Sequence, residues 1–229
     1  MLTIILVVFI ILLISVVAWG SSSINSNMFL KAVCSKKTEE KIVFLTFDDG
    51  PHSAQTPEIL KVLKDEDIKA SFFLIGSKVK ENKKLVEEIV HDGHIIGCHS
   101  FAHSSTNPFR SVKLQESDIA QCLEIIRYIT NVKTKIYRPP FGVTNPSLAK
   151  AVKNLSLTVV GWSIRSLDTL SPAMAVPRVL KKLHPGAVIL LHDTTPGIAD
   201  ITKKIITESK QRGYRFASLD SLSGAQIYE

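Results

Sequence analysis

The chemistry in this sequence begins with two adjacent acids, Asp48 and Asp49, which directly follow an apolar run. The run from Ile42 to Phe47 contains no glycine, proline or charge, which favours a short strand buried on both faces. Gly50 and Pro51 come next and neither continue a strand nor start a helix readily, so both acids are expected on the turn at the strand's carboxyl end. Successive side chains of an extended segment point in opposite directions, so the two carboxylates could serve different partners. Taken alone, they fit an ordinary solvated turn better.

A second pair, His99 and His103, is spaced four residues apart. Imidazoles at that spacing can face the same way on one helical turn, and neutral imidazole is a common ligand of Zn²⁺ and similar ions. A site with two histidines needs an oxygen donor as well, and Asp48 and Asp49 offer two. One of them could bind a metal while the other acts on water. Surface or hydrogen-bonded histidines are the alternative explanation.

Further polar side chains follow other apolar runs. Arg138 begins the segment Arg-Pro-Pro-Phe-Gly, in which the prolines stiffen the loop and the guanidinium can bind a carboxylate through two hydrogen bonds. Trp162 and Asp168 follow a later run, and His192 ends another, where it could donate a proton. Each has an ordinary structural explanation on its own. Together they fall where parallel β/α enzymes build their sites, at the carboxyl ends of the strands.

The elements that would position these side chains alternate between strand-like and helical segments. The expected strands are Ile42–Phe47, Ala70–Leu74, His94–Gly97, Lys135–Tyr137, Leu157–Trp162, Ala187–Leu191 and Arg215–Ala217. The expected helices are Pro57–Asp65, Asn82–His91, Val112–Thr130, Pro146–Lys153, Pro172–Leu183 and Ile198–Gln211. This alternation implies parallel β-α units. Seven strands fit an irregular barrel, and the pattern also allows an open doubly wound sheet.

The amino-terminal segment, residues 1–20, is predicted to span a membrane. Leu2 to Trp19 is almost wholly apolar, and as a helix it would be about 27 Å long at ~1.5 Å per residue, close to the ~30 Å of a bilayer core. A cleavable signal peptide is the alternative, since Ala18 and Gly20 are spaced as a cleavage site requires. The apolar run is longer than usual for a signal, and no Lys or Arg precedes it. The lysines that follow it, from Lys31 onward, favour the cytoplasmic side for the rest of the chain.

Composition describes the remainder of the chain. Residues 21–40 are rich in Ser, Asn and Lys and are predicted to form a linker, and residues 41–229 to form one domain. The net charge of +7 lies entirely after residue 30, which favours anionic surroundings such as lipid head groups or a cell-wall polymer. The lysines are scattered without a basic-aromatic motif, so nucleic acid is not an expected partner. The three cysteines indicate neither a metal site nor a disulfide framework.

Four motifs together resemble those of one enzyme family. They are Thr46-Phe-Asp-Asp-Gly-Pro51, His99-Ser-x-x-His103, Arg138-Pro-Pro-Phe-Gly142 and Leu190-x-His192, and in this order they are similar to the motifs of the polysaccharide deacetylases. This is carbohydrate esterase family four, with the NodB-homology domain, and the resemblance covers about residues 41–222. It implies a distorted seven-stranded (β/α) barrel and a divalent metal, usually Zn²⁺, with Co²⁺ or another divalent ion as alternatives. It also implies hydrolytic removal of N- or O-acetyl groups from a carbohydrate such as peptidoglycan, chitin or xylan, outside the cytoplasm.

The resemblance also implies roles for the reactive side chains. Asp48 corresponds to the catalytic base and His192 to the catalytic acid. The metal ligands correspond to Asp49, His99 and His103. A metal polarises the acetyl carbonyl and lowers the pKa of water from 15.7 toward ~7, so no nucleophilic Ser or Cys is required.

Supporting roles follow from the same resemblance. Arg138 would orient Asp48, and Asp168 would tether Arg138. Leu190 would form a wall of the pocket for the acetyl methyl group, with Trp162 as a further substrate contact, and the Phe141 N–H would stabilise the oxyanion. Where the family has Asp-x-x-Asp-Trp, this chain has Arg-Ser-Leu-Asp-Thr ending at Thr169, so the first acid and the tryptophan are missing. The resemblance therefore does not define the shape of the substrate pocket.

Two other classes of function are compatible with such a barrel. One is a carbohydrate-binding protein without activity, which would tolerate loss of the metal ligands or the base. The other is a metal-dependent hydrolase of small amides, which would close its pocket with added loops. All the implied side chains are present, and the domain has little chain to spare for a lid, so we expect an open groove and an enzyme that acts on a polymer or oligomer.

Overall fold

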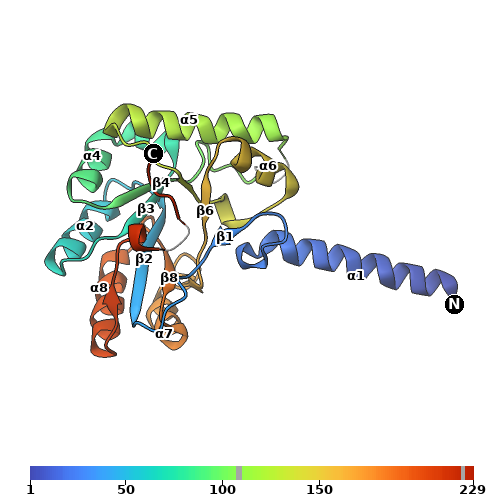
Figure 1. The fold of residues 1–229 in the computed structure, drawn as a ribbon. Coiled ribbons are helices and arrows are strands. Elements are labelled where there is room, and N and C mark those ends of the chain that lie inside the picture. The colour runs from blue at the N-terminus through green and yellow to red at the C-terminus, as the bar shows by residue number, and fades with distance from the viewer. Residues whose placement is uncertain (107–109, 223–224) are drawn as a thin grey trace.

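Parallel strands form the centre of the domain, as the alternation of apolar and helical segments predicts. The computed structural model (Figure 1) describes residues 1–106, 110–222 and 225–229. Its sheet has the strand order β1-β6-β5-β4-β3-β2-β8-β7, with β9 paired to β2. The strands are β1 (Ala32–Val33), β2 (Ile42–Gly50), β3 (Ser71–Leu74), β4 (Ile95–Cys98), β5 (Ile136–Tyr137), β6 (Thr158–Val160), β7 (Ile164–Arg165), β8 (Ala187–His192) and β9 (Arg215–Phe216). All seven expected strands are confirmed, and the observed ends differ from the expected ends by three residues at most.

Helices cover the outside of this sheet (Figure 1). They are α2 (Gln55–Asp65), α3 (Gly76–Glu81), α4 (Lys83–His91), α5 (Val112–Thr130), α6 (Pro146–Asn154), α7 (Pro172–Lys182) and α8 (Ile198–Gln211), while α1 (Leu2–Ser22) projects away from the domain. The six helices expected within the domain are confirmed. The short helix α3 was not expected, because six residues are too few to show a helical period.

The sheet curls into a distorted barrel that its strands do not close. Every strand pair is parallel, and among the described residues the end strands β1 and β7 do not pair with each other. The segment after β1 crosses this gap, because the Lys36 N–H donates to the carbonyl of Gly186 at 2.9 Å and Ser35 forms a bridge with Ala187. This is the barrel class that the sequence predicts, with two additional two-residue strands.

The segment 21–40 was expected to be a linker, and the structure instead makes part of it a component of the sheet. Ala32 and Val33 pair with β6, and Ile24 is buried in the core. Polar composition is typical of linkers, but backbone pairing needs only a few residues with free N–H and C=O groups. The prediction failed because so short a strand carries no detectable pattern.

The apolar helix α1 extends from the domain on the side of β1 and α6 (Figure 1). It is long and apolar enough to cross a membrane, and little of it is buried. Its carboxyl end is fixed to the domain, because the Thr144 N–H donates to the Ser21 carbonyl at 2.8 Å and the Ser21 hydroxyl donates to the Thr144 carbonyl at 2.6 Å. The side-chain amide of Asn25 also donates to the carbonyl of Trp162 at 3.0 Å. The helix is therefore attached at a defined place and not through a flexible tether.

The crossing at Gly186 gives a prediction for stability. Gly186 has a φ of +75°, and a Cβ there would lie 1.9 Å from the Lys36 carbonyl oxygen. We expect Gly186→Ala to lower the free energy of unfolding by about 2–5 kcal/mol, because it adds overpacking to a left-handed backbone. Gly197 has a φ of +72° with no atom within 4 Å of the added Cβ, so Gly197→Ala isolates the backbone cost of about 1–2 kcal/mol. Denaturant titration of the full chain in detergent measures both, and equal losses would contradict the role given to this crossing.

Candidate active site

The two adjacent acids lie in strand β2 and not on a turn beyond it, because the strand continues to Gly50. Asp48 is opposite Phe73 of β3, and Gly50 is opposite Leu74, so Asp49 is the extra residue of a β-bulge. Asp49 has a φ of +72°. A bulge re-aims a side chain, and here it leaves the Asp48 side chain buried and the Asp49 side chain partly exposed. The two carboxylates therefore have different surroundings.

Asp49 lies against both histidines of the second motif. Its Oδ1 is 3.1 Å from His103 Nε2 and 3.4 Å from His99 Nε2, and one ligand atom from each residue lies within 4.8 Å of the others. His99 Nδ1 is 2.8 Å from the carbonyl oxygen of Arg138, so Nδ1 donates that hydrogen bond and Nε2 is the ring nitrogen that faces Asp49. A second hydrogen bond of this kind is typical of metal-ligating histidines. The donor set and its support therefore fit a divalent metal such as Zn²⁺.

The histidines were expected on one helical turn, and the structure places them in a loop after β4. The Asp118 carboxylate in α5 accepts hydrogen bonds from the N–H groups of Phe101 and Ala102 at 2.9 and 3.2 Å. The Ser100 hydroxyl accepts from the His103 N–H at 2.9 Å. These bonds satisfy the loop's backbone without helical pairing, so the imidazoles converge through loop shape.

Arg138 is fully buried, and each of its three guanidinium nitrogens donates at least one hydrogen bond. Nη1 donates to Asp48 Oδ1 at 2.7 Å and to the Thr46 hydroxyl at 2.9 Å. Nε donates to the Val160 carbonyl at 2.9 Å, and Nη2 to the Gly161 carbonyl at 2.8 Å. Burial lowers the pKa of Arg138, and the charge and hydrogen bond of Asp48 oppose that effect. The predicted contact between Arg138 and Asp48 is present, with the guanidinium anchored on β6.

Asp168 was expected to hold Arg138, and this is wrong because its hydrogen bonds hold His192. Oδ1 is 2.9 Å from His192 Nδ1 and accepts from the Ser166 hydroxyl at 2.6 Å. Oδ2 accepts from the His192 backbone N–H at 2.8 Å and from the Thr195 hydroxyl at 3.0 Å. The unexpected strand β7 explains the error, because its pairing with β8 carries the following loop to the end of β8.

Contacts between carboxylates and imidazoles shift the pKa values of His192, Asp168 and Asp49. Burial lowers the pKa of His192, but the Asp168 hydrogen bond and the charge of Asp48 outweigh it, so the net shift is upward. Burial raises the pKa of Asp168, and the His192 hydrogen bond and charge more than reverse this. Burial likewise raises the pKa of Asp49, and the hydrogen bonds of His103 and His99 bring it far below its ordinary value. These shifts favour the imidazolium form of His192 and the ionised forms of Asp168 and Asp49.

The three residues expected to contact a substrate have different exposures. Phe141 is 51% exposed, has a φ of 60°, and its ring centroid lies 4.8 Å from that of His103. Leu190 is buried within β8, and Trp162 is buried against Gly142, where an added Cβ would lie 2.5 Å from the indole ring. Among these three, Phe141 alone presents a largely exposed side chain beside the histidines.

Asp193 is a supporting residue that sequence reasoning missed. Its carboxyl group is buried, accepts a hydrogen bond from the Thr56 hydroxyl at 2.7 Å, and lies where a Cβ on Gly50 would be, 2.0 Å from Oδ2. Burial raises the pKa of Asp193 to about 7. Its position directly after His192 in the sequence was the signal that could have identified it. Asp193 fills the space behind the bulge and requires glycine at position 50.

Comparison with known proteins identifies similar chains. A family model described as polysaccharide deacetylase matches residues 35–160. The peptidoglycan-N-acetylmuramic acid deacetylase PdaA of Bacillus subtilis is 34% identical over 191 residues, which are 81% of this chain and 72% of the relative. The peptidoglycan-N-acetylglucosamine deacetylase PgdA of Listeria monocytogenes is 31% identical over 90% of this chain, which spans 45% of that longer relative.

Solved structures agree with these relatives. A crystal structure of a peptidoglycan N-acetylglucosamine deacetylase superposes with a TM-score of 0.78 at 32% identity, covering 86% of this chain and 94% of that one. A Bacillus anthracis protein described as a pseudoenzyme of carbohydrate esterase family four has a TM-score of 0.76 at 28% identity, covering 82% of this chain and 67% of that one. The same fold therefore occurs in a deacetylase and in a pseudoenzyme. The fold alone does not distinguish an active protein from an inactive one, and the side chains of the site must be used for that.

Proposed function

Because the chain belongs to the polysaccharide deacetylase family, we propose that it removes N-acetyl groups from the amino sugars of peptidoglycan. The chain is a carbohydrate deacetylase, and peptidoglycan is the substrate named for its relatives. The observation that carries the proposal is at Asp48, which has one oxygen held by Arg138 while the other lies 3.8 Å from His99 Nε2. This geometry suits a base beside a metal site, which a binding protein does not need.

We propose that Asp49, His99 and His103 hold a divalent metal, most simply Zn²⁺. When bound, it would polarise the acetyl carbonyl, stabilise the oxyanion and make water more acidic. The closeness of the three donor groups and the hydrogen bond from His99 to the Arg138 carbonyl support this assignment. One carboxylate and two imidazoles leave coordination positions open for water and substrate, as a catalytic site requires.

Asp48 is assigned the part of general base. Arg138 donates a hydrogen bond to Oδ1 of Asp48 at 2.7 Å, which orients the carboxylate so that its other oxygen can accept a proton from the attacking water. The fixed orientation lowers the entropy cost of proton transfer. Removing the guanidinium would leave the buried carboxylate uncompensated.

His192 is assigned the part of general acid, which protonates the departing amine. Asp168 holds its Nδ1 and keeps Nε2 on the opposite side of the ring. Asp168 is therefore a positioning residue in this scheme, because it acts through His192. The Phe141 N–H is the proposed oxyanion donor, a kind of contact worth about 3–4 kcal/mol of barrier.

The assignment of His192 predicts a change in pH dependence. The pKa of His192 is raised, so its acid form persists above the ordinary range, and the rate should fall only as pH passes the raised value. Asp168→Asn removes the largest cause of the rise, so burial, which lowers the pKa of His192, is opposed only by the charges of Asp48 and Asp49. The basic limb of the kcat profile should therefore move to lower pH. An unchanged limb, with kcat simply reduced, would mean that Asp168 has only a structural role.

The function is tested by acetate release. The full chain in detergent, with added Zn²⁺ or Co²⁺, is incubated with peptidoglycan, N-acetylglucosamine oligomers, acetylated xylan and a small acetamide. Release from peptidoglycan or its fragments supports the proposal. Release from the small amide alone would favour a small-amide hydrolase, and release from none would favour a binding protein.

We propose that α1 is an uncleaved membrane anchor and that the domain lies outside the cytoplasm, where peptidoglycan is. Its length, its composition and the contact between Ser21 and Thr144 support this. The protein should sediment with membranes, and protease added to intact cells should remove the domain. Protection until lysis would support the cytoplasmic side that the lysines after the helix suggest.

A further inference from the structure

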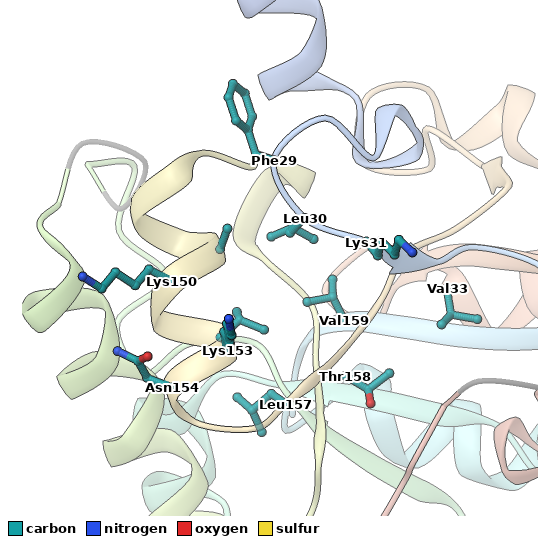
Figure 2. Close-up of a pocket in the computed structure, with 12 residues that line it drawn as sticks. Phe29, Leu30, Lys31, Val33, Lys150, Lys153, Asn154, Leu157, Thr158 and Val159 are labelled. Carbon is teal, nitrogen blue, oxygen red and sulfur yellow. The ribbon is translucent and has the colours of Figure 1, made fainter.

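We infer that a groove between residues 29–33 and α6 binds the head group of an anionic phospholipid of the same membrane. The groove lies beside the carboxyl end of α1 and is lined by residues of β1, α6 and β6 and of the segments next to them (Figures 1 and 2). The inference rests on the proposed anchoring by α1 and adds a second attachment to the membrane. The site is separate from the acids and histidines described above.

The floor of the groove is apolar. Leu30 and Val33 line it from the amino-terminal segment, and Val152, Leu157 and Val159 line it from α6 and the start of β6. Phe29 projects at its upper rim, toward the end of α1 (Figure 2). The groove has a volume of about 860 Å³, which is enough for a lipid head group with part of its acyl chains. An apolar floor beside a membrane helix favours an amphiphilic occupant.

The rim of the groove is basic. Lys31, Lys150 and Lys153 are exposed and line it, and no Asp or Glu is among the lining residues. Within the described ranges 1–106, 110–222 and 225–229, none of these three lysines forms an ion pair. At the edge, Asn154 donates a hydrogen bond to Glu116 of α5. Three lysines without ion pairs around an apolar floor match a lipid that joins an anionic head group to acyl chains.

The attachment of α1 determines which face meets the bilayer. Gly20 and Ser21 bond to Thr144, and Asn25 bonds to Trp162, so the helix end is fixed on the domain near the groove. The chain then runs through Phe29 and Leu30 along the groove. If α1 spans the membrane, the side of the domain that carries β1 and α6 faces the lipid head groups (Figure 1). A zwitterionic head group pairs its phosphate with its own cation and is neutral overall, so the three lysines favour a lipid with a net negative charge.

The test uses the full chain in lipid nanodiscs of phosphatidylcholine alone or with phosphatidylglycerol. Amide hydrogen exchange reports protection of each segment. We expect residues 29–33 and α6 to exchange more slowly in the anionic discs, and this protection to weaken at high salt because exposed charges are screened. β2 should exchange alike in both lipids, which controls for folding.

The variants separate a local site from general charge. Lys31→Gln, Lys150→Gln and Lys153→Gln together should abolish the lipid-dependent protection. A matched control replaces Lys181, Lys203 and Lys204 of α7 and α8 with Gln, which removes the same charge from exposed positions elsewhere and should keep the protection. Both variants should release acetate in detergent at the rate of the unchanged chain.

Three outcomes would overturn the inference. Equal exchange in the two lipids would show that the groove does not select an anionic head group. Equal loss of protection in both variants would assign the effect to total charge and not to the groove. Failure of the chain to enter the discs would contradict the proposal that α1 is a membrane anchor, and this inference with it. Acetate release would remain a separate test of the proposed enzyme activity.

Discussion

Asp48→Asn is expected to keep its metal while releasing acetate roughly 10²–10⁴-fold more slowly, the range that general-base assistance contributes. An amide has nearly the shape of the carboxylate and can still be placed by Arg138, but it cannot accept the proton of the attacking water. Asp48 lies 3.8 Å from His99 Nε2 and is outside the group of three donors. Elemental analysis of the purified variant and its rate of acetate release measure the two properties.

The matched control for this change is Asp200→Asn, an acid-to-amide change in the first turn of α8. It should alter neither metal content nor rate. A metal-free Asp48→Asn protein would contradict the division of roles in β2, because it would make Asp48 a ligand. Full activity in that variant would remove Asp48 from the chemistry altogether.

Asp49→Ala is expected to lose metal and activity together. Asp49 supplies the oxygen ligand of the proposed site, and the two remaining imidazoles bind a divalent ion much more weakly than three donors. Zn²⁺ at high concentration should restore at most part of the rate. Titration of the metal-free protein with Zn²⁺, followed by acetate release at each concentration, measures both effects.

The outcome at Asp49 distinguishes a ligand from a structural residue. Asp200→Ala is the matched control and should bind metal normally. An Asp49→Ala protein that retains metal with unchanged affinity while inactive would contradict the assignment, and the roles of the adjacent acids would have to be exchanged. Hydrogen exchange in β2 would show whether the bulge itself had been lost.

Sequence periodicity predicted the long elements because each must bury an apolar face. The residues of β2 from Ile42 to Phe47 are all buried, as a continuous apolar run requires. β1 was missed because it lies in a segment whose polar composition predicts a linker, and β7 because it follows the strand expected at Leu157–Trp162 too closely to be recognised separately. Without β7, nothing in the sequence places Asp168 beside β8, and its partner was therefore wrongly predicted to be Arg138.

The candidate site was likewise predictable only in part from the sequence. The residue types and their order along the chain indicated which side chains could meet, because the carboxyl ends of parallel strands share one edge. Their orientation depends on irregular backbone: a bulge at Asp49, and left-handed residues at Ser100 and His103. Such shapes are stabilised by distant groups, including Asp118 of α5 and the buried Asp193. Local sequence does not encode these contacts.

The most direct test of the central claim is to locate an acetyl group lost from peptidoglycan. Purified muropeptides or intact glycan strands are incubated with the full chain and Zn²⁺, digested, and analysed by tandem mass spectrometry. We predict fragments that lack one acetyl group on an amino sugar, with an equal amount of acetate released, and neither product with Asp48→Asn. Unchanged sugars in the presence of a metal-loaded, folded protein would contradict the account.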